Sequence, residues 1–261
     1  MLKKAVIAVI VLAVLGGGTL FVLDRTLFAP APITEGVPVA PTIAVPASAP
    51  TSAPVSAPTQ APAAAEPTQA AADPTQAPAA SNAAAQLYRI DAAQSEARYE
   101  VNETFFQDNR LNTAIGRTKG VAGDILVDFN DPAKSQIGDI VINVSQLASD
   151  EGRRDNFIRN NGLESSRYPE ATFKTTAISG LPAQVKTGDV LNFTISGDLT
   201  VKQTTRPVTW QVQLTVGDKQ LSGTAETAIK MSDFGVGPIR LAILATEDDM
   251  KLFFDFVAVA Q

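Results

Sequence analysis

The residue types that most often carry catalysis and metal binding are scarce in this chain. It contains no histidine and no cysteine, so the commonest general base, the commonest metal ligand and any disulfide framework are absent. Three acids stand together at Glu247, Asp248 and Asp249, a run that suits either a calcium site or a solvated loop. Because no acid and base stand at a recognisable catalytic spacing, we expect no enzyme, no metal and no cofactor.

Four arginines lie close together in the sequence, and this grouping is the clearest candidate for a charged binding site. Arg153, Arg154, Arg159 and Arg167 fall within one polar segment that ends at Tyr168. Guanidinium groups bind phosphate in a bidentate manner, so these side chains suit either a lipid headgroup or a solvated charged face. A tyrosine combines an apolar ring with a polar tip, which suits the rim of a site. We therefore take Arg153, Arg154 and Tyr168 as rim or headgroup candidates.

The tripeptide Asp233-Phe234-Gly235 matches a motif of protein kinases. The glycine-rich loop and the His-Arg-Asp run that accompany that motif in kinases are missing, so we exclude a kinase. The remaining interpretation is a turn with Phe234 tucked into one end of the folded domain. Asp233 and Phe234 complete the set of rim candidates.

The whole chain has 261 residues, a net charge of −6 and a pI near 4.8. This acidic balance argues against a nucleic-acid partner. The composition divides the chain into three parts, residues 1–27, 28–86 and 87–261.

Residues 1–27 carry Lys3 and Lys4, followed by an uncharged apolar stretch from Ala5 to Leu23. A helix of this length reaches roughly 28 Å, close to the thickness of a bilayer core. A cleaved signal peptide is the alternative, but the cleavage candidate after Ala31 precedes a proline. We expect an uncleaved transmembrane signal-anchor. The lysines then stay cytoplasmic, and the rest of this single-pass cell-membrane protein is extracytoplasmic, either periplasmic or at the cell surface.

Residues 28–86 are dominated by Ala, Pro, Thr, Ser and Gln, and "PTQAPAA" at 58–64 returns at 74–80. No apolar period exists that could build a core. The composition predicts a disordered, semi-rigid linker with polyproline II character.

Residues 87–261 alternate apolar and polar side chains, which is typical of antiparallel strands with one buried and one wet face. We predict an all-β fold, a single extended lipocalin-like antiparallel β-barrel with one short helix. The expected strands cover 87–91, 95–102, 119–129, 138–147, 170–180, 191–201, 208–216, 221–229 and 249–260.

The inward positions of these strands predict an apolar barrel lining that contacts a ligand. Gly197 and Gly223 lie among the large side chains of that face, and they either leave room for the ligand or mark strand bends and bulges. The predicted lining residues are Phe173, Phe193, Ile195, Leu199, Trp210, Val212, Leu214 and Ala225.

The short helix is expected to begin at Ser149 or Asp150, since either residue suits an N-cap. It is expected to end at Asn161-Gly162, which suits a helix end. Pro169 then disfavours helix at Tyr168 and suits the first residue of a strand. The segment therefore predicts a cap over one barrel end that leads into the barrel wall.

Several stretches, taken in order, resemble the YceI-like family, also known as lipid- or polyisoprenoid-binding proteins. They are "YRIDAAQSEARYEV", "TKGVAGDILVDF", "IVINVSQLASDEGRRDNFIR", "YPEATFKTTAI", "LNFTISGDLTVKQTTRPVTW" and "MSDFGVG". The resemblance covers residues 87–261 and implies an elongated lipocalin-like barrel that encloses a long isoprenoid or similar amphiphile.

Two positions depart from the family's pattern. Family members commonly carry a histidine just before the serine of the opening strand pair, where this chain has Gln94 before Ser95. Gln203 replaces the glycine that usually follows the Leu-Thr-x-(Lys/Arg) run. The loss of histidine at Gln94 puts in doubt a headgroup contact or a metal role for that residue. It does not affect the predicted apolar lining.

The sequence thus predicts a membrane-tethered extracytoplasmic protein that holds or carries an isoprenoid, such as a quinone or a polyprenyl lipid. Its expected partners are that apolar or fatty ligand and the membrane, through its own N-terminal helix, and a homodimer is an open alternative. Two other functions stay open. One is an enzyme acting on a lipid or small amphiphile through Asp and Tyr groups such as Asp233 and Tyr168. The other is a structural surface module with a filled barrel.

Overall fold

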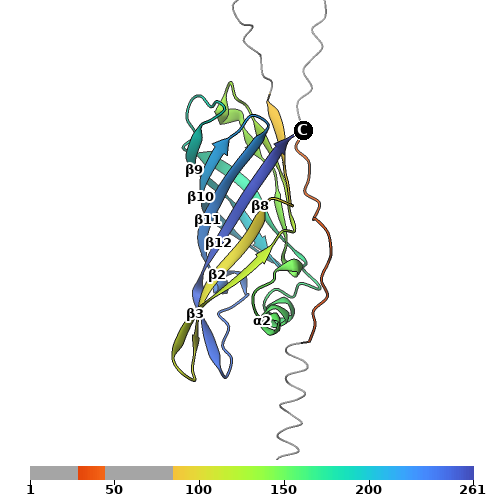
Figure 1. The fold of residues 1–261 in the computed structure, drawn as a ribbon, viewed down its shortest axis with the longest axis vertical. Coiled ribbons are helices and arrows are strands. Elements are labelled where there is room, and N and C mark those ends of the chain that lie inside the picture. Colours follow the sequence, from red (N-terminus) through yellow and green to blue (C-terminus); the bar gives the residue numbers. More distant parts are fainter. Residues whose placement is uncertain (1–28, 45–84) are drawn as a thin grey trace, which may run out of the picture.

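The computed structural model describes residues 29–44 and 85–261 (Figure 1). The predicted transmembrane segment and most of the predicted linker lie outside these ranges. Within them, no helix is both long and apolar enough to cross a membrane.

Residues 86–260 form one antiparallel sheet of twelve strands. The strands are β1 (Gln86–Ile90), β2 (Glu96–Phe105), β3 (Arg110–Thr118), β4 (Val121–Ala122), β5 (Asp124–Val127), β6 (Gln136–Ile137), β7 (Ile140–Asn143), β8 (Glu170–Ser179), β9 (Val190–Val201), β10 (Thr204–Val216), β11 (Gln220–Lys230) and β12 (Leu244–Ala260).

The strand order explains the shape of the sheet. It runs β4-β7-β8-β9-β10-β11-β12-β1-β5-β6, and β2 pairs with both β12 and β3. Only Gly123 separates β4 from β5 in the chain, so the two ends of this path lie close together and the sheet is strongly curled into a barrel-like shape (Figure 1). The predicted antiparallel β class is confirmed, and complete lipocalin-like closure stays a prediction.

The long strand β12 holds both β1 and β2 along the same edge. At the junction between them, the buried Ser95 hydroxyl accepts a hydrogen bond from the Val257 N–H at 3.0 Å and lies 3.3 Å from the Val257 carbonyl, to which it donates. Gln94 beside it is exposed and donates to Asp91 at 2.6 Å. The position where the family carries histidine therefore lies in a surface turn.

The alternation of β9 and β10 places their apolar side chains inside the curled sheet as predicted. Leu191, Phe193 and Ile195 are buried, while the intervening residues point outward. The reason is the two-residue period of a strand, which sends alternate side chains to opposite faces.

The two inward glycines are required by close backbone contacts. A Cβ on Gly197 would lie 2.3 Å from the Lys174 carbonyl and 2.6 Å from the Phe173 ring, and one on Gly223 would lie 2.2 Å from the Gln213 carbonyl. The register of β8 against β9 shifts next to Gly197, which marks a bulge. Of the two interpretations of these glycines, the structure supports bends and close approach rather than open space.

Replacing Gly197 by alanine is therefore expected to lower the free energy of unfolding by about 1–3 kcal/mol, because the added methyl group overpacks the sheet. Urea unfolding measures the change. Asp198→Ala, on the outward face of the same strand, is the control and is expected to change stability by less than about 0.5 kcal/mol. Equal losses in the two variants would contradict this account of the glycine.

The short helical segment comprises α2 (Gly152–Phe157) and the π-helix η3 (Ile158–Gly162), and three 3-10 turns lie elsewhere. The helix begins after Glu151, whose carboxylate accepts from the Arg153 N–H, so the predicted cap at Ser149 or Asp150 was wrong by one or two residues. Its end at Gly162 and the start of β8 directly after Pro169 agree with the prediction. The turns are η1 (Pro132–Lys134), η2 (Val144–Gln146) and η4 (Met231–Phe234).

Residues 29–44, here called the strap, lie along the outside of the curled sheet without regular secondary structure (Figure 1). Asn143 Nδ2 donates to the Thr34 carbonyl at 2.8 Å, and Asn160 Nδ2 donates to the Ala29 carbonyl at 2.7 Å. The strap therefore starts at the helical segment and follows the wall of the domain. The sequence analysis placed these residues in the linker, and the domain boundaries stay a prediction.

Candidate ligand-binding cavity

A cavity of about 790 Å³ lies inside the curled sheet. Its size falls within the range of roughly 300–1,000 Å³ that is typical of small-molecule sites. Most of its wall is apolar and comes from β2, β7, β8, β9, β10, β11, β12 and the helical segment. All eight predicted lining residues are part of this wall: Phe173, Phe193, Ile195, Leu199, Trp210, Val212, Leu214 and Ala225. Whether they contact a ligand stays a prediction.

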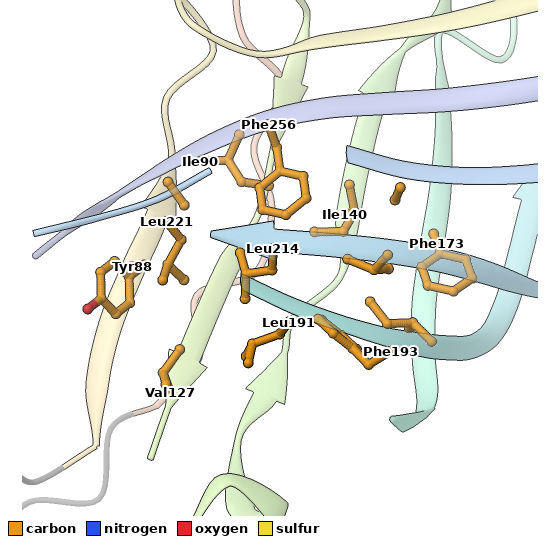
Figure 2. Packing of buried hydrophobic residues seen from close by; sticks show 14 of the residues in the cluster. Tyr88, Ile90, Val127, Ile140, Phe173, Leu191, Phe193, Leu214, Leu221 and Phe256 are labelled. Atoms are coloured by element: carbon orange, nitrogen blue, oxygen red, sulfur yellow. The ribbon is translucent and has the colours of Figure 1, made fainter. Parts of the chain in front are cut away.

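One end of the interior is plugged by close-packed side chains. Tyr88, Val127 and Leu221 pack together there, and none of them lines the cavity (Figure 2). Phe173 and Phe193 lie further along the interior, where the space opens (Figure 2). The cavity is therefore closed at this end by the hydrophobic core.

Aromatic rings shape the middle of the cavity. Phe173 meets Trp210 edge-on, with ring centroids 5.9 Å apart, and Phe254 stacks on Phe256 at 5.6 Å. Such rigid rings provide a large apolar surface that loses little side-chain freedom when a ligand binds.

Charged and polar side chains line the other end, beside α2. Glu103 is only 2% exposed and pairs with Arg154, with Nη2 and Oε1 3.0 Å apart. Asn112 Nδ2 donates to the same carboxylate oxygen at 2.7 Å. Arg154 also pairs with Asp150 at 2.6 Å, so its charge is balanced on two sides. We call these four residues the polar cluster.

Tyr99 lies next to the polar cluster and lines the cavity. Burial and then the negative charge of Asp155 raise the pKa of Tyr99 far above its ordinary value. The phenol therefore stays neutral at physiological pH.

The predicted rim residues divide into two groups. Arg153, Arg154 and Phe234 line the cavity, whereas Tyr168 and Asp233 do not. Tyr168 accepts a hydrogen bond from Gln203, the residue that replaces the family's glycine. The backbone carbonyl of Asp233, not its carboxylate, accepts from Arg206 at 3.3 Å.

The four arginines of the predicted segment do not converge on one site. Arg159 is buried and donates to the Leu147 carbonyl, which fixes the helical segment to the sheet. Arg167 lies over the ring of Tyr168. Of the four, only Arg153 and Arg154 reach the cavity, which argues against a common phosphate-binding cluster.

The acid run at 247–249 does not gather into a metal site. Each of its carboxylates has a different partner, and within the described ranges no three His, Cys, Asp or Glu side chains are placed to hold a metal ion. The partners of Glu247, Asp248 and Asp249 are Asn102, Ser232 and Lys230, in that order. The run is therefore a solvent-facing polar stretch rather than a metal site, but it lies within strand β12 beside a register shift and not in the loop that the sequence predicted.

Sequence reasoning missed the polar cluster apart from Arg154. Glu103 follows Tyr99 and Val101 at two-residue spacing, so continuing the alternation of that strand would have placed its carboxylate inward. Asn112 lies on β3, a strand that the alternation did not predict.

Comparisons with known proteins agree with this geometry. A family model described as the YceI-like domain matches residues 88–258. Protein YceI of Escherichia coli O157:H7 is 29% identical over 164 residues, which cover 60% of this chain and 80% of that protein. Protein YceI of Salmonella newport is 27% identical over 162 residues, 59% of this chain and 78% of that protein.

Two solved structures align with this chain, and the first of them shares its fold. The crystal structure of Burkholderia cenocepacia BcnA aligns with a TM-score of 0.52 at 22% identity and covers 65% of this chain and 99% of that one. A polyisoprenoid-binding domain from Saccharophagus degradans, described as implicated in plant cell wall breakdown, aligns with a TM-score of 0.49 at 13% identity. It covers 67% of this chain and 98% of that domain.

Proposed function

The chain belongs to the YceI-like domain family, and from that premise we propose that its cavity holds the apolar chain of an isoprenoid or similar amphiphilic lipid. The observation that carries the proposal is the apolar cavity of about 790 Å³, plugged at one end and polar at the other. In this proposal the curled sheet acts as a lipocalin-like barrel, and the lipid lies along its interior with its head at the polar cluster.

The energetics favour such a ligand. Each methylene that leaves water for an apolar site contributes roughly 0.8 kcal/mol. A lipid tail of about twenty carbons therefore offsets the freedom it loses on binding, with few polar contacts. The proposed role is binding rather than catalysis, since Tyr168 and Asp233, the two residues named as acid-base candidates, lie outside the cavity lining. The carboxylates of Glu103 and Asp150, which do line it, are both paired with Arg154.

The polar cluster favours an uncharged head. Arg154 already faces the carboxylates of Glu103 and Asp150. Arg110, also in the lining, lies 3.7 Å from Asp108. A pyrophosphate would have to compete with these carboxylates, whereas a hydroxyl, amide or quinone oxygen needs only a hydrogen-bond donor.

The location in the cell is part of the same proposal. The apolar stretch from Ala5 to Leu23 anchors the chain, and Lys3 and Lys4 keep its start cytoplasmic. The lipid-binding domain is then extracytoplasmic and stays attached to the membrane that holds its ligands.

Purification of the full chain from its own host, followed by organic extraction and mass spectrometry, tests the function. We expect close to one isoprenoid or similar amphiphile per chain, with an uncharged head. Extracts without any apolar ligand, from a protein that also takes up no added geranylgeraniol, would contradict the proposal. The matched control is a chain with its cavity blocked, described in the Discussion.

A further inference from the structure

Exposed apolar side chains gather at the polar end of the cavity. Leu111 is 77% exposed, Ile243 63% and Phe106 44%. They lie on the β2–β3 hairpin and on the loop before β12, which extend together from one end of the molecule near α2 (Figure 1). We call these three residues the apolar tip.

Backbone pairing holds the two segments of the apolar tip together. The Phe106 N–H donates to the Ile243 carbonyl at 2.9 Å, and Phe105 is paired with Leu244 in the sheet. The loop is closed on itself by a bond from the Leu241 N–H to the Leu244 carbonyl at 2.9 Å. The hairpin and the loop are therefore held side by side by backbone hydrogen bonds.

This surface continues into the cavity. Phe105, Leu241 and Ile243 all line the cavity, and Ile243 is also one of the most exposed large apolar side chains of the described residues. An apolar path thus leads from solvent, across the tip, to the interior. Large exposed apolar side chains that gather at one end of a molecule mark a candidate interaction site.

The other large exposed apolar side chains of the described residues lie elsewhere. Ile33, Val37 and Val39 belong to the strap. Val190 lies at the plugged end, where it begins β9 and pairs with Thr215. Val190 is 57% exposed and is therefore a matched control for the tip.

The strap begins at this same end of the molecule. The strap begins at Ala29, which is bonded to Asn160 in η3, directly after α2. Leu23 ends the uncharged apolar stretch only six positions earlier. At about 3.3–3.6 Å per residue, those six steps span at most about 22 Å. A membrane that held the stretch would therefore lie near the cavity opening.

We propose that the apolar tip inserts into a lipid bilayer, so that the cavity opens onto the membrane surface from which its ligand enters. The inference rests on the proposed function, because a lipid ligand has its source in a bilayer. Asp108 and Arg110, the two charged residues of the hairpin turn, are paired at 3.7 Å and together add no net charge to the tip.

Site-directed spin labelling tests the insertion in the full chain. The chain has no cysteine, so Leu111→Cys and Val190→Cys each provide a single labelling site. On addition of phosphatidylcholine vesicles, the nitroxide at position 111 should become more accessible to oxygen and less accessible to a water-soluble nickel complex. The label at position 190 should not change. Labels that respond alike, or a label at position 111 that stays accessible to nickel, would overturn the inference.

Ligand transfer provides a second, independent measurement. The double variant Phe106→Ser with Leu111→Ser is expected to take up geranylgeraniol from vesicles about tenfold more slowly or worse, since two large apolar contacts with the bilayer are lost. Neither residue lines the cavity, so equilibrium uptake from detergent micelles should equal that of the wild type. Val190→Ser is the control, with unchanged rates in both assays.

The outcomes separate the two proposals. Equal vesicle transfer rates in the wild type and the double variant would refute insertion of the tip and leave lipid binding intact. A wild type that takes up no geranylgeraniol from micelles would refute the proposed function, while the label at position 111 would still decide whether the tip enters the bilayer.

Discussion

Replacing Ala225 by phenylalanine is expected to weaken binding of geranylgeraniol by about a hundredfold or more. Ala225 is buried on β11, lines the cavity and is paired with Val212 and Phe254, which line it too. A benzyl group at this position projects into the space that the lipid tail needs. Loss of burial for four or five carbons, at roughly 0.8 kcal/mol each, corresponds to more than a hundredfold in affinity.

The control for this variant lies on the same strand. Ala228 is exposed on the outer face of β11, so Ala228→Phe adds the same side chain without entering the cavity. Its affinity should match that of the wild type. Thermal unfolding of both variants shows that the sheet is folded. Wild-type affinity in a folded Ala225→Phe variant would mean that the lipid binds somewhere other than this cavity.

Replacing Arg154 by methionine is expected to lower the free energy of unfolding by about 3–5 kcal/mol, because it leaves the buried carboxylate of Glu103 without its cation. Urea unfolding of the single variant measures this loss. A solvent-exposed ion pair would contribute only about 0–1 kcal/mol, so the size of the change distinguishes a buried pair from a surface pair.

The double variant Glu103→Gln with Arg154→Met should recover a large part of the loss. Glutamine keeps an oxygen that accepts from Asn112 and removes the charge that needed Arg154. A loss below about 1 kcal/mol in the single variant, or a double variant no more stable than the single one, would contradict the polar cluster as described here.

The alternating segments were predictable because the two-residue period of a strand is a local property. Phe193, Ile195 and Leu199 on β9, with Val212 and Leu214 on β10, follow that period without interruption and line the cavity. The start of β8 after Pro169 was also predictable, since proline restricts the residue before it and suits a strand's first position.

The strand β3 was missed because its pattern is inverted near the cavity opening. Its inward positions begin with Arg110 and Asn112, both in the cavity lining, while Leu111 faces solvent. A polar opening and an exposed apolar tip reverse the usual relation between hydrophobicity and burial. The residues that break the strand alternation are thus the same residues that line the cavity opening or form the proposed membrane contact.

The strap was not predictable from composition. Its proline-rich sequence has no apolar period, and it is held by side chains such as Asn143 and Asn160 that come together only in the folded domain. The pairing of Glu103 with Arg154 joins residues far apart in the chain, so no local spacing indicates it.

Titration of the tryptophan fluorescence tests the central claim most directly. Trp210 is the only tryptophan of the chain and lines the cavity in edge contact with Phe173. If an apolar tail fills the interior, added geranylgeraniol should shift the emission to shorter wavelength and saturate near one equivalent per chain. An emission spectrum that does not change on saturating addition of the lipid would contradict an interior binding site.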